Sequence, residues 1–187
     1  MTMDRSAIRH LRLARDSDVP AIEALMQASI RAIFPAFYDA TQTESAARYV
    51  GRVDRMLIED GTYLVVEGED GIVACGGWSR RDKLFSGSAE QEGKARLLDP
   101  TSEPARVRAM FVRGDLTRQG LGTRILEASE SAARTEGFRR LSLMATLAGV
   151  ALYERFGFVA RERVAVTHPD GVVLECVAMD KAIPVVT

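Results

Sequence analysis

The chain has 187 residues, of which 47% are hydrophobic, and its 25 lysines and arginines nearly balance its 26 aspartates and glutamates. This length suits one domain with a substantial core, and a net charge of −1 gives no basic excess for an obligate nucleic-acid partner. No apolar run is long enough to span a bilayer, and the first residues lack the apolar core of a signal peptide. We therefore expect a cytoplasmic protein with no membrane partner.

The first third of the chain alternates strand and helix patterns. Residues 8–14 alternate apolar and charged side chains and predict a half-buried strand. Residues 15–34 place apolar side chains at helical spacing, and Pro35 ends this predicted helix. Residues 36–60 are predicted to be helical again, with poorer periodicity.

The middle of the chain contains a predicted hairpin, a long loop and a strand followed by a helix. Residues 62–81 predict a hairpin, because two β-rich runs flank a turn that contains glycine. Residues 81–104 are polar and turn-rich, and loops of such length are often functional or disordered. A strand over residues 105–112 and an amphipathic helix over residues 120–136 follow.

The last third predicts a strand at residues 139–145, a short helix within residues 149–158 and two strands within residues 159–183. A strand-helix-strand crossover among otherwise hairpin-linked strands predicts a mixed α/β sheet with helices on its faces. Cys75 and Cys176 both lie in apolar, strand-like runs. Two thiols argue against a disulfide framework or a zinc site, so we expect both to be buried and no metal to be bound.

The loop before the helix at residues 120–136 carries the main functional signal. The start of a helix leaves backbone N–H groups unpaired and bears a partial positive charge, so it attracts anions. Gly120 and Gly122 allow the backbone to approach a ligand closely, and Arg118, Gln119 and Arg124 add charge and donors. Together these features favour a pyrophosphate group. The alternative is that the glycines only shape a tight turn between strand and helix.

Two other phosphate-binding motifs do not fit this loop. A P-loop needs Gly-Lys-Ser/Thr, whereas Gly122 is followed by Thr123 and Arg124. The dinucleotide motif G-x-G-x-x-G needs a third glycine at the position of Ile125. Nucleotide binding without acyl transfer is therefore disfavoured.

Two segments together resemble the GNAT superfamily of N-acetyltransferases: VRGDLTRQGLGTRIL, and further along TLAGVALYERFGF. The pattern of that superfamily is a strand, Q/R-x-x-G-x-G/A opening a helix, another strand, and N-x-x-A-x-x-x-Y-x-x-x-G-F. The second element is matched by Thr146, Gly149, Tyr153, Gly157 and Phe158. Three positions depart from the pattern. Thr117 replaces Gln or Arg with Arg118 beside it, Thr146 replaces Asn, and Gly149 replaces Ala.

This resemblance covers residues 8–183 and implies one domain with a mixed, mostly antiparallel sheet of six to seven strands and about four helices. It implies that acetyl-CoA is the co-substrate, bound where the strands at 105–112 and 140–145 splay apart. The pantetheine arm would pair with the edge of the first of these strands, as an added strand does, and a backbone N–H there would steady the oxyanion. The implied cofactor-binding residues are Met110, Phe111, Val112, Arg118, Gln119, Gly120, Leu121, Gly122, Thr123 and Thr146.

The resemblance also assigns a general acid but leaves the base open. A tyrosine phenol, with a pKa of about 10, stays protonated at neutral pH, so Tyr153 is expected to donate a proton to the departing CoA thiolate. The alternative is that Tyr153 serves only as an aromatic anchor for the last helix. The strand at 105–112 contains no acid. The base is therefore open among Glu67, Asp82, Glu103, His168 and a chain of water molecules, and His168 is expected to be a solvated turn residue.

The acceptor is expected to be a small-molecule or peptide amine, and dimers are frequent in similar proteins, so a homodimer is a further expectation. Phe34, Tyr38 and Trp78 are the candidate walls of the acceptor site, with core packing as the alternative for Phe34. Asp39, Glu44 and Asp82 are candidates for attracting a cationic amine, with a solvated surface as the alternative. The leading hypothesis is direct acetyl transfer without a covalent enzyme intermediate. A catalytically silent acyl-CoA-binding module is the alternative, because the expected acid is missing.

Overall fold

The computed structural model describes residues 9–83 and 95–185, which form one seven-stranded sheet in the order β1-β2-β3-β4-β5-β7-β6. Neighbouring strands are antiparallel except for β4 and β5, which are parallel. This mixed sheet confirms the predicted fold class. The strands are β1 (His10–Leu13), β2 (Tyr63–Gly68), β3 (Gly71–Ser79), β4 (Ala105–Val112), β5 (Arg140–Thr146), β6 (Val159–Thr167) and β7 (Val173–Ala182).

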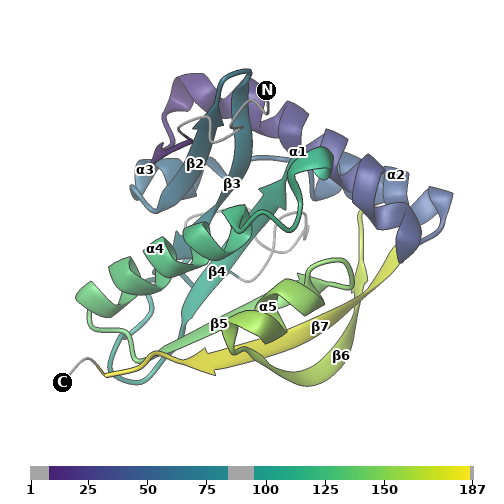
Figure 1. Ribbon diagram of the computed structural model, residues 1–187. Coiled ribbons are helices and arrows are strands. Elements are labelled where there is room, and N and C mark those ends of the chain that lie inside the picture. The colour runs from purple at the N-terminus through teal and green to yellow at the C-terminus, as the bar shows by residue number, and fades with distance from the viewer. Residues whose placement is uncertain (1–8, 84–94, 186–187) are drawn as a thin grey trace.

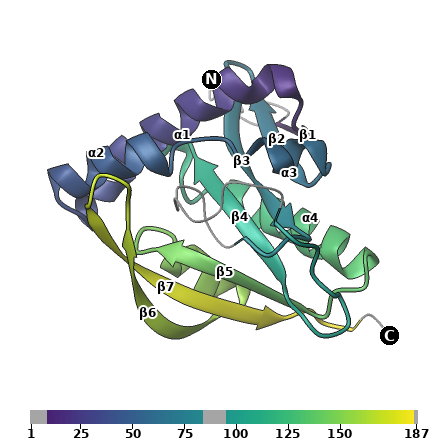
Figure 2. The ribbon, with the colours of Figure 1, turned by 180° about the vertical axis from the view of Figure 1, so that it is seen from behind.

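Helices cover both faces of the sheet. Helices α4 and α5 lie in front of it in Figure 1, and α1 and α2 lie in front when the molecule is seen from behind in Figure 2. Helix α1 packs on β3 and β4 from one side, and α4 packs on the same two strands from the other. The helices are α1 (Val19–Ile33), α2 (Ala40–Tyr49), α3 (Arg55–Glu59), α4 (Leu121–Thr135) and α5 (Val150–Phe156).

The region predicted as one irregular helix, residues 36–60, forms two helices instead. The Asp39 carboxylate accepts a hydrogen bond from the Gln42 N–H and begins α2. The Asp54 carboxylate accepts one from the Met56 N–H and begins α3. Two capping aspartates thus explain both the poor periodicity and a fifth helix where about four were expected.

The long polar segment at residues 81–104 is described only at its two ends. Arg81 forms an isolated antiparallel bridge with Leu97, and the Leu98 N–H donates to the Arg80 carbonyl oxygen. The two ends of the segment therefore lie side by side. Residues 84–94, on which the expectation of a functional loop falls, lie outside the described residues.

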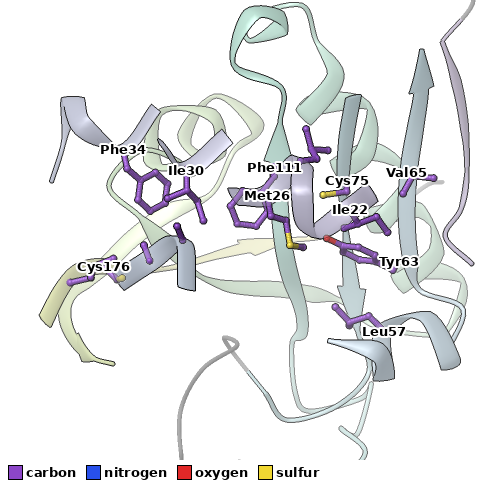
Figure 3. Packing of buried hydrophobic residues seen from close by; sticks show 14 of the residues in the cluster. Ile22, Met26, Ile30, Phe34, Leu57, Tyr63, Val65, Cys75, Phe111 and Cys176 are labelled. Carbon is purple, nitrogen blue, oxygen red and sulfur yellow. The ribbon is translucent and has the colours of Figure 1, made fainter. Parts of the chain in front are cut away.

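The core beneath α1 includes residues of β2 and β3 as well as residues of β7. Figure 3 shows Ile22, Met26 and Ile30 of α1 above the sheet, with Tyr63 and Cys75 near them and Cys176 further along. Cys75 and Cys176 are both buried and unbridged, as the sequence predicted. No helix in residues 9–83 and 95–185 has the length and apolar character needed to cross a membrane.

Candidate active site

A cavity of about 890 Å³ lies beside the two parallel strands. Only two residue pairs, Ala105 with Leu141 and Arg106 with Ser142, join β4 to β5, and beyond them the strands diverge (Figure 2). The expected splay is therefore present. All of the expected cofactor-binding residues except Gln119 line this cavity: Met110, Phe111, Val112, Arg118, Gly120, Leu121, Gly122, Thr123 and Thr146.

The start of α4 presents unpaired backbone amides to the cavity. Gly120 has a φ of 80° and precedes the helix without a side-chain cap, and the first bond of the helix runs from the Arg124 N–H to the Gly120 carbonyl oxygen. Within the described part of the chain, the N–H groups of residues 118–123 donate no hydrogen bond. A Cβ placed on Gly120 would meet no heavy atom within 4 Å. Open space and free donors at a helix N-terminus fit a diphosphate.

The polar side chains of this loop divide into two groups. Arg118 lines the cavity and has a φ of 63°, which is uncommon for a residue with a side chain. Gln119 and Arg124 instead bind the segment at residue 9. The Arg9 Nη1 donates to the Gln119 Oε1 at 2.9 Å, and the Arg124 Nη1 donates to the Arg9 carbonyl oxygen at 2.7 Å. Neither Gln119 nor Arg124 lines the cavity.

A β-bulge in β4 forms another part of the wall. Cys75 pairs with Phe111 and Gly77 pairs with Arg108, so two residues of β4 oppose one residue of β3. Within this bulge Ala109 has a φ of 51°. A bulge interrupts the regular hydrogen bonding of a sheet and redirects the backbone. The expected oxyanion-binding segment therefore lies on irregular backbone that lines the cavity.

Tyr153 lies on α5 and is 9% exposed, and it lines the cavity. Its ring packs edge-on against Phe158, with a centroid distance of 5.7 Å. Its hydroxyl makes no hydrogen bond with the residues that the structure describes. Burial raises the pKa of the Tyr153 phenol above its ordinary value, so the hydroxyl keeps its proton at neutral pH. The ring thus anchors α5 and leaves the hydroxyl available as a donor.

The carboxylates considered as bases are engaged elsewhere. Glu67 forms an ion pair with Arg12 at 2.6 Å, and Asp82 and Glu103 both pair with Arg96. The hydrogen bonds from Arg96 lower the pKa of Glu103 to about 2. None of the three carboxylates lines the cavity.

His168 corrects an expectation, because it is buried rather than solvated. It is 4% exposed, its Nδ1 lies 2.8 Å from the Ser45 Oγ of α2, and its ring lies 5.7 Å from that of Tyr49. The Ser45 hydroxyl also lies 3.0 Å from the Asp170 Oδ1. His168 lines the cavity. The turn looks solvated in isolation, and α2, more than a hundred positions earlier in the chain, covers it.

The three candidate acceptor walls lie in different places. Phe34 lines the cavity. Tyr38 does not, because its hydroxyl is held between the Leu147 N–H at 2.8 Å and the Glu175 carbonyl oxygen at 2.7 Å. Trp78 does not either, because it is buried edge-on against Phe138.

The carboxylates proposed to attract a cationic amine are also engaged. Asp39 caps α2, and Glu44 forms an ion pair with Arg31 at 2.9 Å. Asp82 pairs with Arg106 at 2.8 Å. None of these three carboxylates lines the cavity, and each instead contacts a group of the protein itself.

Arg108 lines the cavity, although the sequence analysis did not name it as a site residue. Its side chain is buried in β4 and lies 3.2 Å from the Asp54 carboxylate. Lys83 reaches the same carboxylate at 3.0 Å. A charged residue in the apolar run ARVRAMFV was the available signal, because a buried charge requires a partner. Among the described residues, no group of three or more His, Cys, Asp or Glu could hold a metal ion.

An open mixed sheet whose parallel strands splay beside a helix start is the architecture of the acyl-CoA N-acyltransferase fold. A sequence model of the acetyltransferase (GNAT) family matches residues 24–158, which is well over half of the chain. The chain therefore belongs to the GNAT acetyltransferase family.

Solved structures show the same fold at low sequence identity. A GCN5-related N-acetyltransferase from Rhodopseudomonas palustris is 20% identical with a TM-score of 0.68, over 97% of this chain and 98% of that one. The PaiA N-acetyltransferase from Thermoplasma acidophilum, solved with coenzyme A, is 13% identical with a TM-score of 0.64, over 93% and 98%. The ribosomal-protein-S18-alanine N-acetyltransferase from Escherichia coli is 18% identical with a TM-score of 0.57, over 96% and 97%. No curated protein matches the chain.

Proposed function

We propose that this protein is an N-acetyltransferase that transfers the acetyl group of acetyl-CoA directly to a primary amine of a small molecule or a peptide. The observation that carries the proposal is the row of unpaired amides at residues 118–123, which opens into the same cavity as Tyr153. Free donors at a helix start suit a diphosphate, and a protonated phenol suits a departing thiolate.

The residues that would hold acetyl-CoA line the cavity. The amides of residues 118–123 would bind the diphosphate, and Arg118 would add a positive charge. The edge of β4 at Met110–Val112 would pair with the pantetheine arm, and Thr146 would contact it from the end of β5. When bound, acetyl-CoA supplies an activated acetyl group as a thioester.

Three features of the chain support direct transfer. The backbone at the β4 bulge would stabilise the oxyanion, and Tyr153 would protonate the thiolate. Burial raises the pKa of Cys75 to about 12 and that of Cys176 to about 11. Both thiols therefore stay protonated at neutral pH, which argues against an acetyl-cysteine intermediate.

Ligand-dependent melting followed by thiol release tests this function. Acetyl-CoA and CoA should raise the melting temperature, whereas NAD and ATP should not, because the loop lacks both nucleotide motifs. Thiol release from acetyl-CoA should then depend on an amine drawn from a panel of small primary amines and peptides. Stabilisation by NAD or ATP but not by CoA would contradict the proposal.

Binding of CoA without turnover across the panel would favour a silent acyl-CoA-binding module. The specific observation behind that second candidate is that β4, from Ala105 to Val112, carries no carboxylate. Whether another residue can serve as the base therefore decides between the two functions.

A further inference from the structure

We propose that His168 is the general base of the reaction, positioned by Ser45 and Asp170, and that the acceptor amine binds beside it, between α2 and the β6–β7 hairpin. This inference rests on the proposed acetyl transfer and deepens it. The position of His168 supports this assignment, because His168 lines the same cavity as Tyr153 and the β4 bulge.

The imidazole is held on a fixed backbone. The His168 N–H donates to the Val172 carbonyl oxygen at 2.8 Å, and the Gly171 N–H donates to the His168 carbonyl oxygen at 2.9 Å. The Tyr49 ring packs against the imidazole from α2. A base whose orientation is set in advance loses little freedom when the substrate arrives.

The hydrogen-bond partners of His168 and Ser45 assign the tautomer of this histidine. The Ser45 hydroxyl has one hydrogen and lies within reach of both the His168 Nδ1 and the Asp170 Oδ1. Desolvation raises the pKa of the Asp170 carboxyl, but hydrogen bonds from the Val172 N–H and Ser45 lower it further, so the net pKa lies below its ordinary value. Asp170 is therefore an ionised carboxylate that only accepts hydrogen bonds. Ser45 therefore donates to Asp170 and accepts from Nδ1–H. The lone pair of the imidazole is then on Nε2.

Nε2 is the atom that remains for the substrate. Among the residues that the structure describes, none forms a hydrogen bond with it. The groups that surround the ring are Ser45 and Tyr49 from α2, and Asp170 from the hairpin, which it reaches through Ser45. Burial lowers the pKa of His168, and the Asp170 charge opposes this only partly, so the ring is neutral at pH 7.

As the amine nitrogen attacks the acetyl carbonyl, the N–C bond forms and the π pair moves onto the oxygen, and Nε2 of His168 takes a proton from that nitrogen. The oxygen pair returns, the C–S bond breaks, and the leaving sulfur takes the proton of Tyr153. Amide and thiol result. Solvent then removes the proton from the imidazolium and restores the phenol. Asp170 stabilises the imidazolium through Ser45 and is a positioning residue.

Kinetics against pH test the assignment. Wild-type protein, His168→Gln and the control His10→Gln would be assayed with acetyl-CoA and the best amine of the panel, from about pH 5 to pH 9. His10 lies on β1 and is exposed, so its variant should behave as wild type. In wild type, kcat/KM expressed per concentration of unprotonated amine should fall as the pH drops through the imidazole pKa, below 6.5. His168→Gln should lose about 100-fold or more at pH 7 together with this acid limb, while the KM for acetyl-CoA is unchanged.

The outcomes separate the two proposals. If His168→Gln keeps both the wild-type rate and the wild-type pH profile, the base assignment is overturned while the acetyltransferase function stands. If wild-type protein turns over no amine, the proposed function is overturned and the base assignment with it.

A spectroscopic measurement tests the tautomer without turnover. In ¹⁵N NMR spectra of the imidazole, wild-type protein should show His168 protonated on Nδ1 and unprotonated on Nε2. Ser45→Ala removes the acceptor of Nδ1–H, so it should move the proton toward Nε2 and lower kcat/KM, although the protein stays folded. A proton on Nε2 in the wild-type protein, with Nδ1 bare at pH 7, would contradict the proposal.

Discussion

The Tyr63 hydroxyl of β2 donates a hydrogen bond of 2.8 Å to the Ala109 carbonyl oxygen in the β4 bulge. The tyrosine reaches past β3 where the sheet register places Gly77 opposite it. At the neighbouring Gly76, a Cβ would lie 2.2 Å from the Met110 Sδ. The two glycines of β3 therefore allow the sheet to form and hold this bulge.

Replacing Tyr63 with phenylalanine tests that link. Tyr63 is 1% exposed, so Tyr63→Phe leaves the Ala109 carbonyl without its donor and should cost about 1–3 kcal/mol of unfolding free energy. Because the bulge is also the proposed oxyanion site, kcat should fall as well. Denaturant unfolding and steady-state kinetics measure the two effects. Unchanged stability would show that the hydrogen bond does not hold the bulge.

Gly120→Ala tests the open space at the start of α4. The added Cβ meets no protein atom but occupies the proposed diphosphate position, and a φ of 80° should cost about 1–2 kcal/mol of stability. Gly61→Ala is the matched control, because Gly61 has a φ of 67°, meets no atom within 4 Å and does not line the cavity. Calorimetry should show weaker acetyl-CoA binding for Gly120→Ala alone. Equal binding by both variants would contradict the proposed diphosphate site.

Tyr153→Phe removes the proposed acid and little else. The hydroxyl makes no hydrogen bond within the described residues, so folding and CoA affinity should be nearly unchanged. The ring contact with Phe158 remains. Turnover at saturating acetyl-CoA should fall about 100-fold, which is at the lower end for general acid–base catalysis. A turnover rate equal to that of wild type would remove Tyr153 from the mechanism.

The hydrogen bonds from Arg96 to Glu103 predict a change in acid stability. The folded-state pKa of Glu103 is about 2, below its ordinary 4.5, so this pair stabilises the fold above pH 4.5 and loses its contribution as the pH falls toward 2. Glu103→Gln should therefore lower the melting temperature near neutrality and reduce its fall in acid. Melting curves recorded from neutral pH down to about pH 2 check the sign of both changes in melting temperature. A wild-type acid profile in the variant would contradict the predicted contribution.

The local signals in the sequence predicted which residues at the start of α4 line the cavity better than they predicted the surroundings of Tyr38, Trp78 and His168. The strand, the glycine loop and α4 follow one another along the chain, so short-range rules place Gly120 and the amides beside it. His168 depends on α2 packing over a distant hairpin, which no local pattern encodes. The side chains of Tyr38 and Trp78 are held by contacts with residues far away in the sequence.

A charged contact between α4 and β7 gives the last prediction. Glu130 is 8% exposed, accepts a hydrogen bond from Arg134 at 3.0 Å and forms an ion pair with Lys181 of β7. Glu130→Gln removes the charged partner that both cations share among the described residues and should cost about 1–3 kcal/mol of unfolding free energy. The exposed Glu127→Gln on the same helix should change it by less than about 0.5 kcal/mol. Acetyl-CoA affinity should be the same in both variants, because Glu130 lies about two helical turns beyond Thr123, the last of the amides at the helix start. Weaker binding by Glu130→Gln alone would show that this contact also positions the start of α4.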